Sequence, residues 1–86
     1  MKFEFNEKKS LANKEKHGID FIEAQSLWLD EDRIIIPGIS IDEERFILIG
    51  RIGKKHWLSI YTERKTKIRI ISVRRSRKEE VELYES

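Results

Sequence analysis

A run of cationic residues near the carboxyl end of the chain is the feature best suited to chemistry. Between Arg64 and Lys78 there are eight lysine and arginine residues and no aspartate or glutamate. Such a cluster repels itself unless an anion meets it, so it predicts a binding surface for nucleic acid or an acidic protein. Within it, Ile68–Val73 predicts a β-strand, and Ser76 with Glu79 has the form of a capping box. A strand that leads into a helix N-terminus beside arginines is a suitable place to hold phosphate.

These cations suit the cleavage of RNA without a metal ion. In that reaction the RNA 2′-hydroxyl attacks the neighbouring phosphate, so the protein must move two protons and stabilise charge on the phosphoryl group. Arginine suits the second role because its planar fork binds two phosphate oxygens and stays protonated. The side chains that could move the protons are His17, Glu63, Glu79 and Tyr84. For His17, an interaction with the dipole at a helix C-terminus is an equal alternative.

Two arginines end predicted strands. Residues 45–51 and 67–74 each read as an apolar strand, and these strands end at Arg51 and Arg74. Side chains two positions apart share a face, which groups Arg45, Ile47, Ile49 and Arg51 on one strand, and Ile68, Ile70, Ser72 and Arg74 on the other. Whether the two arginines meet depends on the strand order, which this pattern leaves open. Arg64 lies in the turn after Tyr61–Glu63.

Length and composition favour one folded domain over residues 1–86. Hydrophobic residues make up 38% of the chain and recur in blocks, so we expect a folded core rather than disorder, although 40% of residues are charged. The absence of cysteine excludes disulfides and cysteine-based zinc sites. No apolar run resembles a signal peptide or approaches the length of a membrane span, which makes a cytoplasmic location the expectation.

No metal or cofactor is expected from this sequence. The two histidines, His17 and His56, are far apart, and the acidic turn Asp30–Asp32 reads as a solvated loop. A glycine-rich phosphate loop and a nucleophile motif are both absent.

The charge is distributed unevenly along the chain. Residues 1–43 carry 6 basic and 10 acidic side chains, a net charge of −4, whereas residues 44–86 carry 12 and 6, a net charge of +6. This asymmetry favours a basic surface on the second half, suited to nucleic acid or an acidic protein. Two oppositely charged, solvated faces are an equal alternative.

Periodicity and capping signals predict an α+β fold of order β-α-α-β-β-β-β-α, with a small, mostly antiparallel sheet and helices packed on it. Asn6 and Gly18 bound a first surface helix over residues 7–17. Asp20 and Glu23 begin a second, amphipathic helix. The remaining predicted elements are strands over residues 2–5, 33–36, 45–51, 56–62 and 67–74, and a last helix over residues 77–84.

Four groups of residues carry a resemblance to a known family. They are Lys16-His17-Gly18-Ile19-Asp20-Phe21 with Ala24, Glu44-Arg45-Phe46 with Ile49-Gly50-Arg51, Tyr61-Thr62-Glu63-Arg64, and Arg69-Ile70-Ile71-Ser72-Val73-Arg74-Arg75 with Glu79 and Tyr84-Glu85. On these motifs essentially the whole chain resembles the BrnT-type toxins of bacterial type II toxin–antitoxin systems. At Arg75-Ser76 the chain departs from the family pattern, which has small residues there. The rest of the motif is still recognisable.

The resemblance implies a RelE-like fold and a metal-independent endoribonuclease that arrests translation. It also implies a partner, a small ribbon-helix-helix antitoxin that binds operator DNA, so that this chain reaches DNA only through the antitoxin and represses its own operon with it. The motifs assign catalytic roles to Arg74, Arg51, Arg64 and His17. Together with the cationic run they suggest RNA contacts by Lys67, Arg69, Arg75, Arg77, Lys78 and Tyr84.

A second hypothesis from another class is a non-catalytic basic adaptor that binds RNA or an acidic protein. The two are distinguished by whether the arginines converge with a proton carrier or are spread over a flat face. A DNA-binding regulator is a weaker hypothesis, because no predicted helix combines a basic face with helix-turn-helix spacing.

Overall fold

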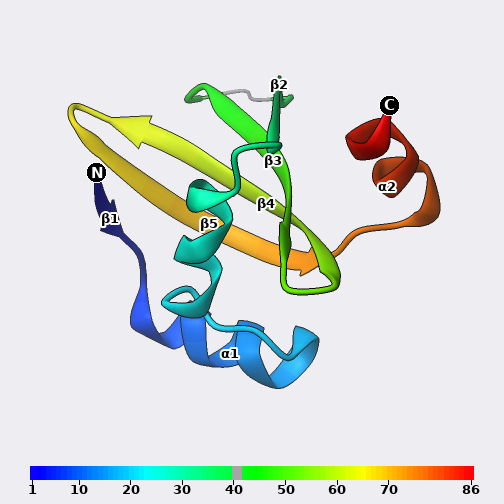
Figure 1. Ribbon diagram of the computed structural model, residues 1–86. Coiled ribbons are helices and arrows are strands. Elements are labelled where there is room, and N and C mark those ends of the chain that lie inside the picture. The colour runs from blue at the N-terminus through cyan, green and yellow to red at the C-terminus, as the bar shows by residue number, and fades with distance from the viewer. Residues whose placement is uncertain (40–41) are drawn as a thin grey trace.

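The computed structural model describes residues 1–39 and 42–86. The chain forms an α+β fold, as the sequence predicts (Figure 1). Its elements in order are β1 (Lys2–Glu4), α1 (Glu7–His17), η1 (Glu23–Leu29), β2 (Ile34–Pro37), β3 (Arg45–Ile52), β4 (Lys55–Arg64), β5 (Lys67–Arg75) and α2 (Lys78–Glu85). No helix in this part of the chain is both long and apolar enough to cross a membrane.

The five strands form one mixed sheet in the order β1-β5-β4-β3-β2. Strands β2 to β5 pair with antiparallel neighbours, but β1 runs parallel to β5. The prediction of a mostly antiparallel sheet is therefore wrong for this edge. A hairpin forces antiparallel pairing, and none joins β1 to β5, which come from opposite ends of the chain.

The second predicted helix is a 3₁₀ helix, η1, rather than an α-helix. The predicted capping signature is present, because Asp20 Oδ1 accepts from the Glu23 amide at 2.7 Å and Glu23 Oε1 accepts from the Asp20 amide at 3.0 Å. Phe21, Ala24 and Leu27, three residues apart, are all buried, and this spacing matches the 3₁₀ period rather than the α-helical one.

The core lies between η1 and one face of the sheet. Trp28 packs edge-on against Tyr61 and Phe3, each at 5.1 Å between ring centroids, and Leu48 and Val73 are fully buried beside them. Figure 1 shows α1 and η1 on one side of the sheet and α2 beyond the end of β5.

Helix α1 is attached to this core by polar groups. Asn13 Nδ2 donates to the Ile19 and Val73 carbonyls at 2.8 and 2.9 Å, and Asn13 Oδ1 accepts from the Val73 amide at 3.2 Å. Ser10 Oγ accepts from the Phe21 amide at 2.9 Å. Both side chains are buried, whereas Leu11 is 70% exposed, so hydrogen bonds rather than an apolar stripe hold this helix.

An irregularity in β5 changes which of its side chains share a face. Ile60 of β4 pairs with Ser72, but its neighbour Tyr61 pairs with Ile70, which leaves Ile71 unpaired. The grouping of Ile68 and Ile70 with Ser72 and Arg74 is therefore wrong. A bulge adds one residue to a strand and so reverses the alternation of faces beyond it. Ile70 points into the core, and Arg74 lies on the opposite face, across from Leu58.

Candidate functional site

The strand order places Arg51 and Arg74 at the same end of the sheet. Strands β3 and β5 are both antiparallel to β4, which lies between them, so β3 and β5 run in the same direction. Arg51 pairs with His56 of β4, and Arg74 pairs with Leu58, two residues further on. Residues paired directly across antiparallel strands share a face, so the two arginines lie on the same face, with their backbones about 12 Å apart across two strand spacings and two residues of offset.

Helix α2 crosses this end of the sheet. Its N-cap is Arg77, whose amide donates to Glu80 Oε1 at 2.7 Å. The predicted capping box at Ser76 and Glu79 is therefore wrong by one residue. The cause is that the Ser76 amide donates to the His56 carbonyl at 3.0 Å and so extends the sheet pairing.

Arg74 is held by α2 through its fork. Its Nη1 and Nη2 donate to the two carboxylate oxygens of Glu80 at 2.9 and 2.7 Å, and Nη1 also donates to the Arg75 carbonyl at 3.1 Å. This pairing raises the pKa of Arg74 and lowers the pKa of Glu80. An arginine fork that binds a carboxylate with two parallel bonds has the geometry to bind a phosphate in the same way.

Tyr84 of α2 is linked to the Arg51 backbone through Asp30. The Tyr84 hydroxyl donates to Asp30 Oδ2 at 2.7 Å, and the Arg51 amide donates to the same oxygen at 2.8 Å. Partial burial raises the pKa of Asp30. The hydrogen bonds from Tyr84, the Asp32 amide and the Arg51 amide outweigh this effect, so the pKa of Asp30 lies below its ordinary value. Gly50 leaves room for this carboxylate, because a Cβ there would lie 3.4 Å from Asp30 Oδ2.

Asp30 is a residue whose role the sequence did not reveal. It was interpreted as part of a solvated turn, whereas its carboxylate joins η1, β3 and α2 at the candidate site. An acidic turn carries no pattern that separates a carboxylate in solvent from one that binds a tyrosine 54 residues later.

His56 was also missed as a site residue. Its ring packs edge-on against Tyr84, with 5.0 Å between centroids, and its buried Nε2 has no hydrogen-bond partner among the described residues. The signal for it lay in the short gap between the strands predicted over residues 45–51 and 56–62. A short turn at Gly53 and Lys54 places Arg51 directly across from His56.

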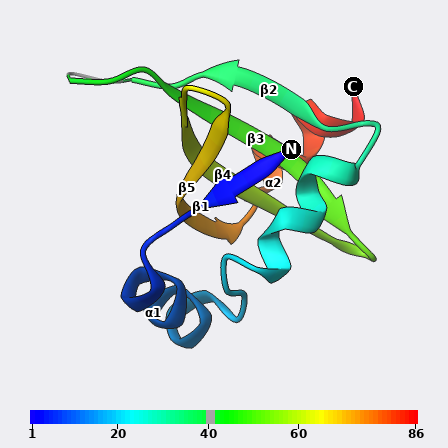
Figure 2. The same cartoon turned by 90° about the vertical axis from the view of Figure 1, so that its left-hand side faces the viewer.

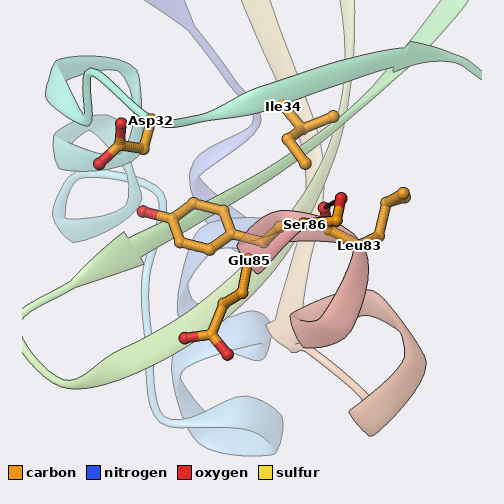
Figure 3. A pocket seen from close by; sticks show the side chains of 6 residues that line it. Asp32, Ile34, Leu83, Glu85 and Ser86 are labelled. Carbon is orange, nitrogen blue, oxygen red and sulfur yellow. Dashed lines mark hydrogen bonds between the residues drawn. The ribbon is translucent and has the colours of Figure 1, made fainter.

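A pocket of about 570 Å³ opens beside this cluster, between the start of β2 and the end of α2. Figure 3 shows Asp32 and Ile34 on one side of it and Leu83, Glu85 and Ser86 on the other. Because Tyr84 also lines the pocket, a ligand bound there would lie next to the phenol.

Other predicted site residues lie elsewhere. Arg64 is at the far end of β4, eight residues or roughly 26 Å from His56, and pairs with Glu43 at 3.4 Å. His17 ends α1 and lines a separate pocket of about 270 Å³ with Ile71 and Ser72. Within residues 1–39 and 42–86, no hydrogen bond or ion pair joins His17 or Arg64 to Arg51 or Arg74.

The predicted RNA-binding cations divide into two groups. Lys67 and Arg69 begin β5 at the far end, where Arg69 lies 3.8 Å from Glu4. Arg75, Arg77 and Lys78 surround the site end, and the Arg75 guanidinium lies over the Trp57 ring at 5.4 Å.

Replacing Tyr84 with phenylalanine should remove a pH dependence of stability between pH 10 and 12. Burial and the hydrogen bond to Asp30 raise the pKa of Tyr84 from 10.0 to about 12. The folded protein therefore holds the phenolic proton more tightly than the unfolded chain, so Tyr84 stabilises the fold below pH 10 and this contribution is lost as the pH rises. Urea unfolding from pH 8 to 12 should show the free-energy difference between wild type and Tyr84→Phe shrinking across this window. A difference that stays constant would show that the phenol is not held by Asp30.

The comparison with protein families gives a match over residues 5–80. The matching model describes the ribonuclease toxin BrnT of type II toxin–antitoxin systems. The comparison with curated proteins gives no match.

Proposed function

Because the chain belongs to the BrnT family of ribonuclease toxins of type II toxin–antitoxin systems, we propose that it cleaves RNA without a metal ion at the cluster formed by Arg51, His56, Arg74 and Tyr84. In this proposal the 2′-hydroxyl of the RNA attacks the adjacent phosphorus, and the bond from phosphorus to the 5′-oxygen breaks. The products carry a 2′,3′-cyclic phosphate and a 5′-hydroxyl.

The two arginines stabilise the charge that develops on the phosphoryl oxygens. Arg74 exchanges the Glu80 carboxylate for the phosphate, which presents oxygens at a similar spacing. Arg51, on the same face, binds the phosphate from the other side of β4. The guanidinium groups stay protonated throughout, so they supply positive charge without taking part in proton transfer.

His56 and Tyr84 carry the protons. With its raised pKa, Tyr84 keeps its proton at neutral pH; when RNA binds, its hydroxyl exchanges Asp30 for the departing 5′-oxygen and donates the proton there. RNA binding must first expose the buried Nε2 of His56, which has no hydrogen-bond partner among the described residues and can then accept the proton of the attacking 2′-hydroxyl. Asp30 acts as a positioning residue, since it holds both the Tyr84 hydroxyl and the backbone of Arg51.

The placement of two arginines and two possible proton carriers at one end of the sheet is the observation that supports this proposal. A basic adaptor needs only positive charge spread over a surface. Its binding does not require the contact between His56 and Tyr84 or the pairing of Arg74 with Glu80. Arg64 and His17, away from this cluster, are proposed to contact the RNA strand beyond the scissile phosphate, together with Lys67, Arg69, Arg75, Arg77 and Lys78.

Membership of a type II family implies an antitoxin partner. We propose that this partner is a ribbon-helix-helix protein that represses the shared operon together with the toxin. We also propose that the toxin acts in the cytoplasm, where its RNA substrate is found, and that its sheet and helices are of the RelE-like type.

Expression of this chain alone in bacteria should stop growth and protein synthesis, and co-expression of the antitoxin should restore both. The reason is that messenger RNA is cut faster than it is made until the antitoxin binds the toxin. Incorporation of labelled methionine after induction measures the effect, and Arg74→Ala is the control expected to be harmless. Normal protein synthesis at a high level of folded wild-type chain would contradict the proposal.

A further inference from the structure

An apolar groove lies on the molecule between β1 and η1, away from the arginine cluster. It has a volume of about 470 Å³ and is lined by Met1, Phe3, Ile22, Gln25, Ser26, Trp28 and Leu29. Figure 2 shows β1 and η1 side by side on the face turned toward the viewer. Because β1 pairs with the first three residues of β5, the groove is roughly 20 Å from Arg74 along that strand.

Large apolar side chains are exposed at this groove. Met1 is 77%, Ile22 66% and Leu29 82% exposed, and these three lie around the same depression. Single exposed apolar residues are common on proteins, but a group of them beside a groove typically marks an interaction site. Ile22 directly precedes η1 and Leu29 is its last residue, and both side chains point away from the core.

The charges around the groove select the kind of partner. None of its seven lining residues has a charged side chain. The acidic residues on either side of η1 are Asp20, Asp30, Glu31 and Asp32, whereas Glu23, the first residue of η1, is paired with Lys14 at 2.8 Å. RNA would be repelled by these carboxylates and would find no cationic side chain among the residues that line the groove. A protein segment with an apolar face and basic flanks is complementary in both respects.

Trp28 lies at the same place. Its indole lines the groove, and its buried Nε1 has no hydrogen-bond partner among the residues that the structure describes.

We propose that this groove binds the antitoxin, through an amphipathic helix that places apolar side chains between β1 and η1 and basic residues against the acidic flanks. The inference rests on the proposed function for the identity of the partner. In helix-in-groove binding, the bound helix carries apolar side chains at helical spacing. Here those side chains would contact Met1, Ile22 and Leu29 of the groove. Leu29 directly precedes Asp30, so a partner bound here would also contact the segment that positions Tyr84.

The test measures binding of the purified antitoxin from the neighbouring gene to purified toxin variants by calorimetry. Ile22→Glu places a carboxylate in the groove at an exposed position, and it should weaken binding at least about a hundredfold. Leu11→Glu is the matched control, because Leu11 is equally exposed but lies on α1 outside the groove, and it should change the affinity less than about threefold. Circular dichroism would establish that each variant is folded.

A second measurement reports on the groove directly. In a Trp57→Phe background, Trp28 is the only tryptophan, and its emission should change on addition of antitoxin and stay unchanged on addition of RNA. In cells, Ile22→Glu should remain toxic and should no longer be rescued by the antitoxin.

The outcomes separate this inference from the proposed function. Wild-type affinity for Ile22→Glu, equal losses for Ile22→Glu and Leu11→Glu, or an RNA-dependent change at Trp28 would each overturn the groove assignment. So would the absence of any antitoxin binding to the wild-type toxin. A chain that does not arrest growth, but whose antitoxin binding is lost with Ile22→Glu, would overturn the ribonuclease proposal and support the groove.

Discussion

Arg74→Ala should abolish RNA cleavage while the protein remains folded. Removal of an electrostatic contact to a transition state typically costs about 3 kcal/mol or more, so the rate should fall at least about a hundredfold. Arg74→Lys should recover only part of it, because an ammonium group cannot reproduce the two parallel bonds of the guanidinium fork. The fold should survive because Arg74 is partly exposed, and because the Arg77 amide still binds Glu80 at the start of α2.

The neighbouring Arg75 supplies a matched control. It carries the same charge but faces the other side of the sheet, against Trp57. Arg75→Ala should raise the KM for RNA modestly and leave kcat within about threefold of wild type. Cleavage of a labelled RNA under single-turnover conditions would measure both variants. Equal effects of Arg74→Ala and Arg75→Ala would mean that the segment acts only through its overall charge.

Asn13→Ala should be among the most destabilising single substitutions in this chain. It leaves the Val73 amide and the Ile19 and Val73 carbonyls without their partner inside the protein. Each unsatisfied buried group costs about 1–3 kcal/mol, so a loss of roughly 3 kcal/mol in the free energy of unfolding is expected. For a domain of this length that corresponds to a fall in Tm of about 12 °C or more.

Asn6→Ala is the control for this substitution. Asn6 is exposed, and its side chain makes a single hydrogen bond, from the Lys9 amide at 3.0 Å. Loss of this N-cap should cost only about 1 kcal/mol. Thermal unfolding followed by circular dichroism gives both values. Similar melting temperatures for the two variants would show that α1 is not held to the sheet through Asn13.

Local signals in the sequence predicted most elements of this fold. Asn6 and Gly18 bound α1 as expected, with Gly18 in the left-handed conformation at φ 83°. The β-branched runs predicted β2 to β5, because strand formation there depends on nearby residues. The parallel pairing of β1 with β5 was not predictable in this way, since it joins segments more than 60 residues apart.

The candidate site was predictable to a smaller extent. Arg51 and Arg74 could be recognised as strand-ending arginines, but their meeting at one end of the sheet follows from the position of β4 between their strands. The bulge at Ile71 then decides which face Arg74 occupies, and no residue type in this segment predicts the bulge. Asp30 and Asn13 act through contacts 54 and 60 residues away, which are beyond the reach of any local pattern.

The central claim is that the RNA 2′-hydroxyl is the nucleophile and that this chain's own side chains catalyse its attack. The most direct test compares two labelled RNAs in the presence of a chelator, one of them carrying a single 2′-deoxynucleotide on the 5′ side of the cleaved bond. The proposal predicts that the unmodified RNA is cut to a 2′,3′-cyclic phosphate and a 5′-hydroxyl, and that the modified RNA stays intact at that bond. Cleavage of the 2′-deoxy substrate, fragments with a 5′-phosphate, or loss of all cleavage on addition of chelator would contradict it.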